Sequence, residues 1–475
     1  MNAPRASGLF STGLLLARSR FTTREGESLL YLAGTLAFLI CSALALTLAG
    51  GTMLFFNRWQ QPRGILAELL GIDQTFDHVL MFYFVLALVA CTLIVPSIFA
   101  LASSAAVLGA RGRERRLAAL RLIGLSARDV SRMSLVDTLV QAVAGTSIGV
   151  VVYLVSLPLW GNLEMLALPL TAEEMLLDWY LIAAIALFVI LLGLVSAWWG
   201  LRQVRISPLG VARQAARPGL KAWRLAIFAG VLIAGSVGLN ALSLGRAIWG
   251  FGVLVGIMLG MIAAFNAVGP WFLQQFSKLF ALARWPSVIW AARRIQASPQ
   301  MTWHRVAGVS LLALIGGYVA LMPISVNGDS AGEAGASFAD AVAWDFTKGA
   351  IITLAIGFAL TATSILINQA SAVFERAEQS VAMARMGAPF SYGIKVMWLE
   401  TLGPLVLAVT LGAALGAGMA YPMYDLARRL GAGSQSGPLI MVGVLVAGIG
   451  LASGALTACL PLQRQVLGAH RRVND

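Results

Sequence analysis

The sequence predicts an all-α polytopic membrane protein of ten transmembrane helices, arranged as two four-helix repeats and a two-helix connector. Three observations predict this fold: the composition, ten long apolar stretches and an internal repeat. Of the 475 residues, 59% are hydrophobic and only 12% are charged, whereas a soluble protein carries roughly 25% charged residues. A chain this apolar cannot hide its surface in a single water-soluble core, so lipid is the expected solvent.

The ten apolar stretches each meet the length of about 20 residues that a spanning helix needs. They are residues 28–56, 77–110, 131–160, 177–201, 225–244, 248–277, 306–326, 343–374, 394–421 and 439–462. Several exceed 25 residues, which predicts tilt or extension beyond the bilayer. An even number of spans places both termini on the same side of the membrane.

The basic residues indicate which side that is. If both termini are cytoplasmic, all but six of the 34 basic residues fall in cytoplasmic segments, the exceptions being Arg58, Arg63, Arg246, Lys348, Arg428 and Arg429. This asymmetry predicts that both termini of the multi-pass protein are cytoplasmic. The net charge of +13 is then a topology signal and a contact with anionic lipid, and nucleic acid is not an expected partner. Residues 1–27 are expected to form an amphipathic helix on the cytoplasmic surface.

An internal repeat divides the spans into two related halves. Glu114, Ala118 and Arg121 recur as Glu378, Ala382 and Arg385. Further along each copy, Gly124 recurs as Gly387, and the acidic Asp137 is matched by Glu400. Each copy lies between the second and third spans of a four-span unit. We therefore expect units at residues 28–213 and 284–475, joined by a two-span connector at 214–283. Two connector spans keep both units in the same orientation, so they should be related about the membrane normal.

The repeated segment resembles the FtsX-like permease family, which includes MacB-type ABC transporter permeases. The first copy reads RGRERRLAALRLIGLSARDV and is followed by Asp137 and the small-residue motif Gly145-TSI-Gly149; the second copy has Gly412-AAL-Gly416. The ten-span plan resembles the bacitracin-exporter type, and this resemblance implies a location in a bacterial plasma membrane. Members of this family usually carry a large outside domain, whereas the corresponding loops here, 57–76 and 327–342, are short.

The resemblance implies that each repeated segment is a coupling helix docking on an ATPase. The residues concerned are Glu114, Arg115, Leu117, Leu120, Arg121 and Gly124 in the first copy, and Glu378, Ala382, Arg385 and Gly387 in the second. A basic loop facing anionic lipid is the alternative. The chain has no G-x4-G-K-[ST] phosphate loop, so we expect no catalytic residue and no cofactor here. ATP and Mg would be bound by a separate ABC ATPase, in two copies. No cysteine or histidine spacing predicts a metal site.

Several residues inside the spans carry alternative interpretations. Asp137 and Glu400 either pair with an arginine of the adjacent cytoplasmic loop, or are solvated carboxylates near a helix start; a proton relay is a third interpretation. Gly145, Gly149, Gly412 and Gly416 are expected at helix–helix contacts rather than at substrate. The stripe Thr353, Gly357, Thr361, Ser364 and Asn368 occupies one helix face, as a helix contact or as a substrate path.

These observations favour the permease subunit of an ATP-driven transporter that exports or extracts a hydrophobic or amphiphilic compound, such as an antimicrobial, a peptide or a lipid. Efflux and antibiotic resistance would follow from that activity. The alternative is an ATPase-coupled signalling or cell-wall regulatory protein that moves no solute. An ATP-independent secondary transporter would need more charged residues deep in the spans.

Overall fold

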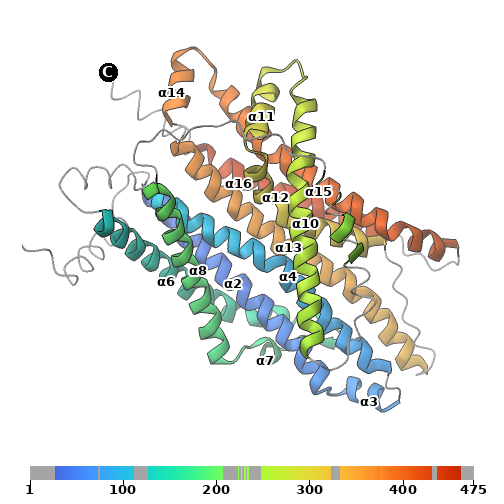
Figure 1. The fold of residues 1–475 in the computed structure, drawn as a ribbon. Helices are drawn as coiled ribbons and strands as arrows, with labels where there is room; N and C mark the ends of the chain where they lie inside the picture. The colour runs from blue at the N-terminus through green and yellow to red at the C-terminus, as the bar shows by residue number, and fades with distance from the viewer. Residues whose placement is uncertain are drawn as a thin grey trace, which may run out of the picture.

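The fold is known from a computed structural model, which describes residues 27–72, 75–111, 127–206, 248–321, 332–375, 377–429 and 436–461, with a few positions between 223 and 234. Long helices make up nearly all of it (Figure 1). The first unit consists of α2 (Glu27–Gln60), α4 (Thr75–Arg111), α6 (Ala127–Trp160) and α8 (Trp179–Ile206). The second consists of α12 (Pro299–Leu321), α13 (Gly332–Glu375), α15 (Phe390–Arg429) and α16 (Ser436–Ala458).

Seven of the described helices are long and apolar enough to cross a membrane: α2, α4, α6, α8, α12, α13 and α15. In α16 the apolar segment is shorter, Leu445–Ala458. The sixth expected span lies within α10 (Ile248–Phe280), and most of the fifth lies outside the described residues. The chain is therefore a multi-pass, all-α membrane protein, and the total of ten spans stays a prediction.

The two units repeat the same packing. In the first, α2 contacts α4 and α6, and α8 contacts α4 and α6; in the second, α12 contacts α13 and α15, and α16 contacts α13 and α15. A Cβ added to Gly149 would lie 2.6 Å from the Leu39 carbonyl oxygen of α2, and one added to Gly416 would lie 1.8 Å from the Leu314 carbonyl oxygen of α12. Gly145 and Gly412 make equally close approaches to the same helices. All four glycines thus lie at the contact between the first and third helices of a unit, where only glycine leaves room.

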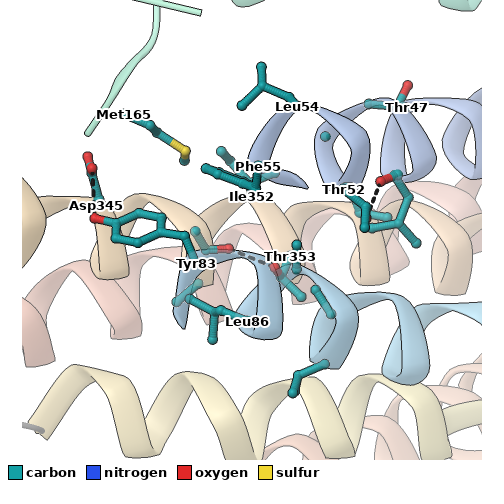
Figure 2. A pocket seen from close by; sticks show the side chains of 18 of the residues that line it. Thr47, Thr52, Leu54, Phe55, Tyr83, Leu86, Met165, Asp345, Ile352 and Thr353 are labelled. Carbon is teal, nitrogen blue, oxygen red and sulfur yellow. Dashed lines mark hydrogen bonds between the residues drawn. The ribbon is translucent and has the colours of Figure 1, made fainter. Parts of the chain in front are cut away.

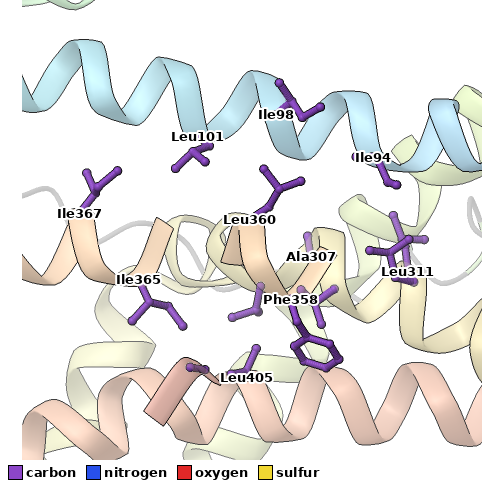
Figure 3. Packing of buried hydrophobic residues seen from close by; sticks show 14 of the residues in the cluster. Ile94, Ile98, Leu101, Ala307, Leu311, Phe358, Leu360, Ile365, Ile367 and Leu405 are labelled. Carbon is purple, nitrogen blue, oxygen red and sulfur yellow. The ribbon is translucent and has the colours of Figure 1, made fainter. Parts of the chain in front are cut away.

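The second helices of the two units, α4 and α13, pack against each other. Ile94, Ile98 and Leu101 of α4 face Leu360 and Ile367 of α13 in the largest buried apolar cluster (Figure 3). Contacts of α13 with α2 and of α4 with α12 flank this interface. Equivalent helices therefore meet across the boundary between the units, as expected for a pseudo-twofold arrangement about an axis between α4 and α13.

Opposite ends of the helix bundle carry different short elements (Figure 1). At one end lie α3 (Ile65–Ile72), the antiparallel strands β1 (Glu164–Met165) and β2 (Leu168–Pro169), and α7 (Ala172–Met175). We call this the α7 end. At the other end lie α11 (Pro286–Ala297) and α14 (Ala377–Arg385), and we call it the α14 end.

Within the described part of the chain, the α7 end carries one small β-hairpin in an otherwise helical fold. The two loops expected at this end need correction. The expected loop 327–342 is helical from Gly332 onward, because α13 runs 44 residues without interruption. The expected loop 57–76 also contains a helix, α3. Ala, Leu and Glu in these segments favour helix, while the segments are too short or too polar to be predicted as spans.

Candidate functional site

The site is a cavity of about 160 Å³ between the two units. Its walls come from α2 and α4 of the first unit and from α12 and α13 of the second, which are the equivalent first and second helices of each repeat. Leu54, Phe55 and Leu86 face Ile352 and Thr353 across it (Figure 2). The cavity therefore lies where any relative movement of the units would change its shape.

The wall of the cavity is apolar because its hydroxyl groups are already bonded within their own helices. Thr52 donates to the Leu48 carbonyl at 2.8 Å and Thr353 donates to the Gly349 carbonyl at 2.7 Å. Thr47 makes the same bond one turn earlier in α2, to Ala43. Helical threonines commonly bond to the carbonyl four residues earlier in this way. The surface that remains suits an uncharged, apolar occupant.

A buried carboxylate lies at one end of the cavity. The Asp345 side chain has no exposed surface, and its Oδ2 accepts hydrogen bonds from the Tyr83 hydroxyl at 3.0 Å and from the Leu166 N–H at 2.6 Å (Figure 2). Its Oδ1 pairs with Lys348 Nζ at 3.1 Å. Three donors, one of them a cation, offset the cost of removing this carboxylate from water.

Residues 161–178, which we call the cap, cover the α7 end of the cavity with Met165, Leu170 and Met175. The turn of its hairpin consists of Leu166 and Ala167, with φ of 59° and 58°. A two-residue turn with both φ values positive normally uses Asn and Gly. Leucine in this conformation costs on the order of 1 kcal/mol or more. The hydrogen bond from its N–H to Asp345 and the burial of its side chain hold it there.

Arg58 anchors the cap to the end of α2. Its side chain is 4% exposed and forms an ion pair with Glu174 at 2.7 Å. It also donates to the carbonyls of Met165 at 2.7 Å and Pro169 at 2.9 Å. A planar guanidinium with several donors can join a helix, a hairpin and a carboxylate at once. Thr171, the N-cap residue of α7, and Glu174 exchange the two hydrogen bonds of a capping box, which stabilises the start of this helix.

The Arg58 pair also controls the charge of Glu174. Partial burial acts to raise the pKa of this carboxyl, but the hydrogen bond and positive charge of Arg58 outweigh it and hold the pKa below its ordinary value. On the far side of the cap, the Tyr153 hydroxyl of α6 donates to the Met175 carbonyl and accepts from the Leu177 N–H. The cap is thus fixed to α2 and α6 of the first unit.

The second predicted coupling segment lies at the opposite end of the molecule from the cap. The first copy, Glu114 to Gly124, lies outside the described residues. In the second copy, Glu378, Ala382 and Arg385 are part of α14, and Gly387 follows it with φ of 85°, where glycine ends a helix. Figure 1 shows α14 standing away from the helix bundle. Arg385 is exposed, and Met386 beside it is 76% exposed.

The two intramembrane carboxylates occupy equivalent positions, each ten residues after the start of its helix, α6 or α15. Asp137 is only 3% exposed, so the solvated interpretation is wrong for it. Glu400 pairs with Arg294 at 3.1 Å. That arginine belongs to α11, not to the loop of the coupling helix as expected. The pair therefore joins α11, which leads into the second unit, to the third helix of that unit.

The polar stripe of α13 does not act as one surface. Thr353 lines the cavity, while Gly357 packs against Leu312 of α12 and Thr361 is buried. Asn368 donates to the carbonyl and to the hydroxyl of Ser364. Within the described residues, no three His, Cys, Asp or Glu side chains are grouped so that they could hold a metal ion.

Sequence reasoning missed the residues that shape the site. Tyr83 and Asp345 were not singled out, and Arg58 and Lys348 were named only as exceptions to the charge asymmetry. A signal for the cap was present, since Thr171 and Glu174 have capping-box spacing. The positions of Arg58 and Lys348 were a second signal, because a basic residue on the less basic side of the membrane suggests a specific binding partner within the protein.

Comparison with known families agrees with this architecture. Residues 93–209 match the FtsX-like permease C-terminal family. The chain contains an FtsX-like permease domain. It runs from α4 through α6 and α8, and includes the first copy of the repeat with Asp137, Gly145 and Gly149. No curated protein and no solved structure shows significant similarity to the chain. The FtsX-like permease domain supports a permease subunit of an ABC transporter, a class that generally works with an ABC ATPase.

Proposed function

We propose that the chain is the membrane subunit of an ATP-driven transporter that extracts a hydrophobic or amphiphilic compound from the bilayer and exports it. The cavity between the units carries this proposal. Its wall is apolar, and at about 160 Å³ it holds roughly one aromatic ring or a short alkyl segment, since an engineered apolar cavity of about 150 Å³ binds benzene. A larger amphiphile would place only its apolar part there.

The energy would come from two copies of a separate ABC ATPase that bind ATP and Mg. With both termini cytoplasmic, α14 faces the cytoplasm and the cap faces outside. One ATPase would dock on α14 and the other on the segment Glu114–Gly124. An amphipathic helix seated in a groove needs an apolar anchor flanked by charge, and Met386 beside Arg385 offers one. Movement of α14 would reach α13 and α15, which are its neighbours in the chain.

The second candidate function is a regulatory one, in which ATPase movement is relayed to another protein and no solute moves. The structured cap favours it, because a relay needs an ordered surface outside the membrane. Reconstitution of the chain with its ABC ATPase in lipid nanodiscs distinguishes the two. ATP hydrolysis stimulated by hydrophobic compounds supports transport. A complex whose hydrolysis responds only to a co-purified outside protein supports the relay and contradicts transport.

A further inference from the structure

The cap is joined unequally to the two units. Its bonds to the first unit come from Arg58, with four hydrogen bonds to the cap, and from Tyr153. Among the described residues, its polar bonds to the second unit come from a single turn of α13: Asp345 accepts from the Leu166 N–H, and Lys348 donates to the Glu164 carbonyl at 2.7 Å. The cap should therefore move with the first unit when the units shift.

The contacts across the boundary form or break together. Asp345 of the second unit receives two donors from the first unit, the Tyr83 hydroxyl of α4 and the Leu166 N–H of the cap. If α13 moves away from α4 at the α7 end, the Asp345 carboxylate loses both of these hydrogen bonds, and Lys348 loses its hydrogen bond to the Glu164 carbonyl. Water must then replace all of these partners, since an unpaired buried carboxylate is costly. We therefore expect two discrete states, one with these contacts formed and one with all of them broken, rather than a continuous range of positions of α13.

Opening this contact would also open the cavity. Tyr83, Met165 and Asp345 line the cavity as well as taking part in or adjoining the contact. Figure 2 shows Asp345 and Met165 together at one end of the cavity, with Tyr83 pointing toward the carboxylate. At that end, Asp345 accepts from the N–H of Leu166, the turn residue of the cap with a φ of 59°.

We infer that Asp345 is the gate residue of the cavity, and that its contact with Tyr83 and Leu166 closes the passage between the cavity and water at the α7 end. The inference rests on the proposed function only for the role that the gate would have in transport. The gate itself is a property of this chain, so it is tested without the ATPase, and failure of the transport assay leaves it standing.

The test measures access of a charged, water-soluble methanethiosulfonate reagent to the cavity in the full chain in nanodiscs. Gly51→Cys supplies the target, because Gly51 lines the cavity and an added Cβ there meets no atom within 4 Å. Cys91 and Cys459 are replaced by Ala. Cys41, which is fully buried, stays as a reporter of unfolding. The gate variant is Asp345→Ala, and the matched control is Asp178→Ala, an exposed carboxylate of the cap that accepts a bond from Tyr180.

Asp345→Ala should raise the labelling rate of position 51 at least about tenfold, since bonds to a charged group of this kind are each worth more than a tenfold shift in population. Asp178→Ala should leave the rate unchanged. Labelling in Asp345→Ala as slow as in the parent, or equal acceleration by Asp178→Ala, would overturn the inference. If Asp345→Ala also exposes Cys41, Asp345→Asn replaces it under the same criteria, because it keeps the shape and removes the charge.

Discussion

The Tyr83 hydroxyl of α4 donates a hydrogen bond of 3.0 Å to the Asp345 carboxylate of α13, across the boundary between two repeated four-helix units. These residues are 262 positions apart in the chain. Their contact stands between an apolar cavity and a cap of only 18 residues, 161–178. Each unit supplies one partner, so the bond reports directly on whether the units are together at the α7 end.

Tyr83→Phe tests how much this bond stabilises the folded chain. The change removes one donor from a buried carboxylate and leaves the ring in place, so we expect a loss of about 1.5–3 kcal/mol in the free energy of unfolding. Tyr180→Phe is the matched control, because its hydroxyl also bonds an aspartate but is exposed. Denaturant unfolding in detergent micelles gives both values. Equal losses in the two variants would show that the buried Tyr83 bond stabilises the fold no more than the exposed Tyr180 bond does.

Gly416 and Gly418 of α15 offer a matched test of the packing between α12 and α15. Gly416→Ala places a Cβ 1.8 Å from the Leu314 carbonyl oxygen and should cost about 1–3 kcal/mol through forced separation of the helices. Gly418→Ala meets nothing within 4 Å and should be neutral or stabilise by up to about 1 kcal/mol. Thermal unfolding compares them. A Gly416→Ala variant as stable as Gly418→Ala would refute the close approach.

Glu174 predicts a pH dependence of the cap. Arg58 holds the pKa of this carboxyl below its ordinary value of 4.5, so the folded chain favours the charged form. The resulting stabilisation is fully present above pH 4.5 and is lost as the pH falls through the lowered pKa of the folded state. As the pH is lowered from 6 to below the pKa of Glu174 in the folded chain, the melting temperature of the parent should therefore fall more than that of Glu174→Gln. Parallel curves for the two proteins would rule out this linkage.

The exposed end of α14 is the predicted contact with the ATPase. Met386→Asp puts a charge on the apolar side chain that would enter the ATPase groove, and should weaken binding by about tenfold or more, equivalent to about 1.4 kcal/mol. Stability should not change, because Met386 is 76% exposed. Gln275→Asp, which adds the same charge at an exposed position of α10, is the control. Titration of labelled ATPase onto nanodiscs measures both. Unaltered affinity in Met386→Asp would place the docking surface elsewhere.

The sequence was sufficient to predict a multi-pass helical protein because membrane spans depend on a local pattern, and seven described helices are long and apolar enough to be spans. Long apolar stretches predict spans, and Gly145, Gly149, Gly412 and Gly416 predict where helices approach. The cap could not be predicted in this way. Its turn uses Leu166 and Ala167 in a conformation that their residue types do not favour, and it forms because Asp345, 179 residues away from Leu166, supplies an acceptor. Such a partnership is visible only once distant helices are placed together.

The partner of Glu400 shows the same limit. The sequence indicated an arginine, but several lay within reach of the predicted span end. Only the placement of α11 against α15 selects Arg294. One interpretation of Asp137 placed it near water because its depth was counted from the predicted span start, whereas the packing of the surrounding helices leaves it buried.

Filling the cavity tests the central claim most directly. Gly349→Leu adds a side chain at a position that lines the cavity and where an added Cβ meets nothing within 4 Å, and Gly443→Leu adds the same side chain on the exposed surface of α16. The measurement is ATP hydrolysis by the permease–ATPase complex in nanodiscs as a hydrophobic compound is added. The account predicts that Gly349→Leu loses the stimulation while Gly443→Leu keeps it. Full stimulation in Gly349→Leu would contradict the cavity as the place where the compound binds.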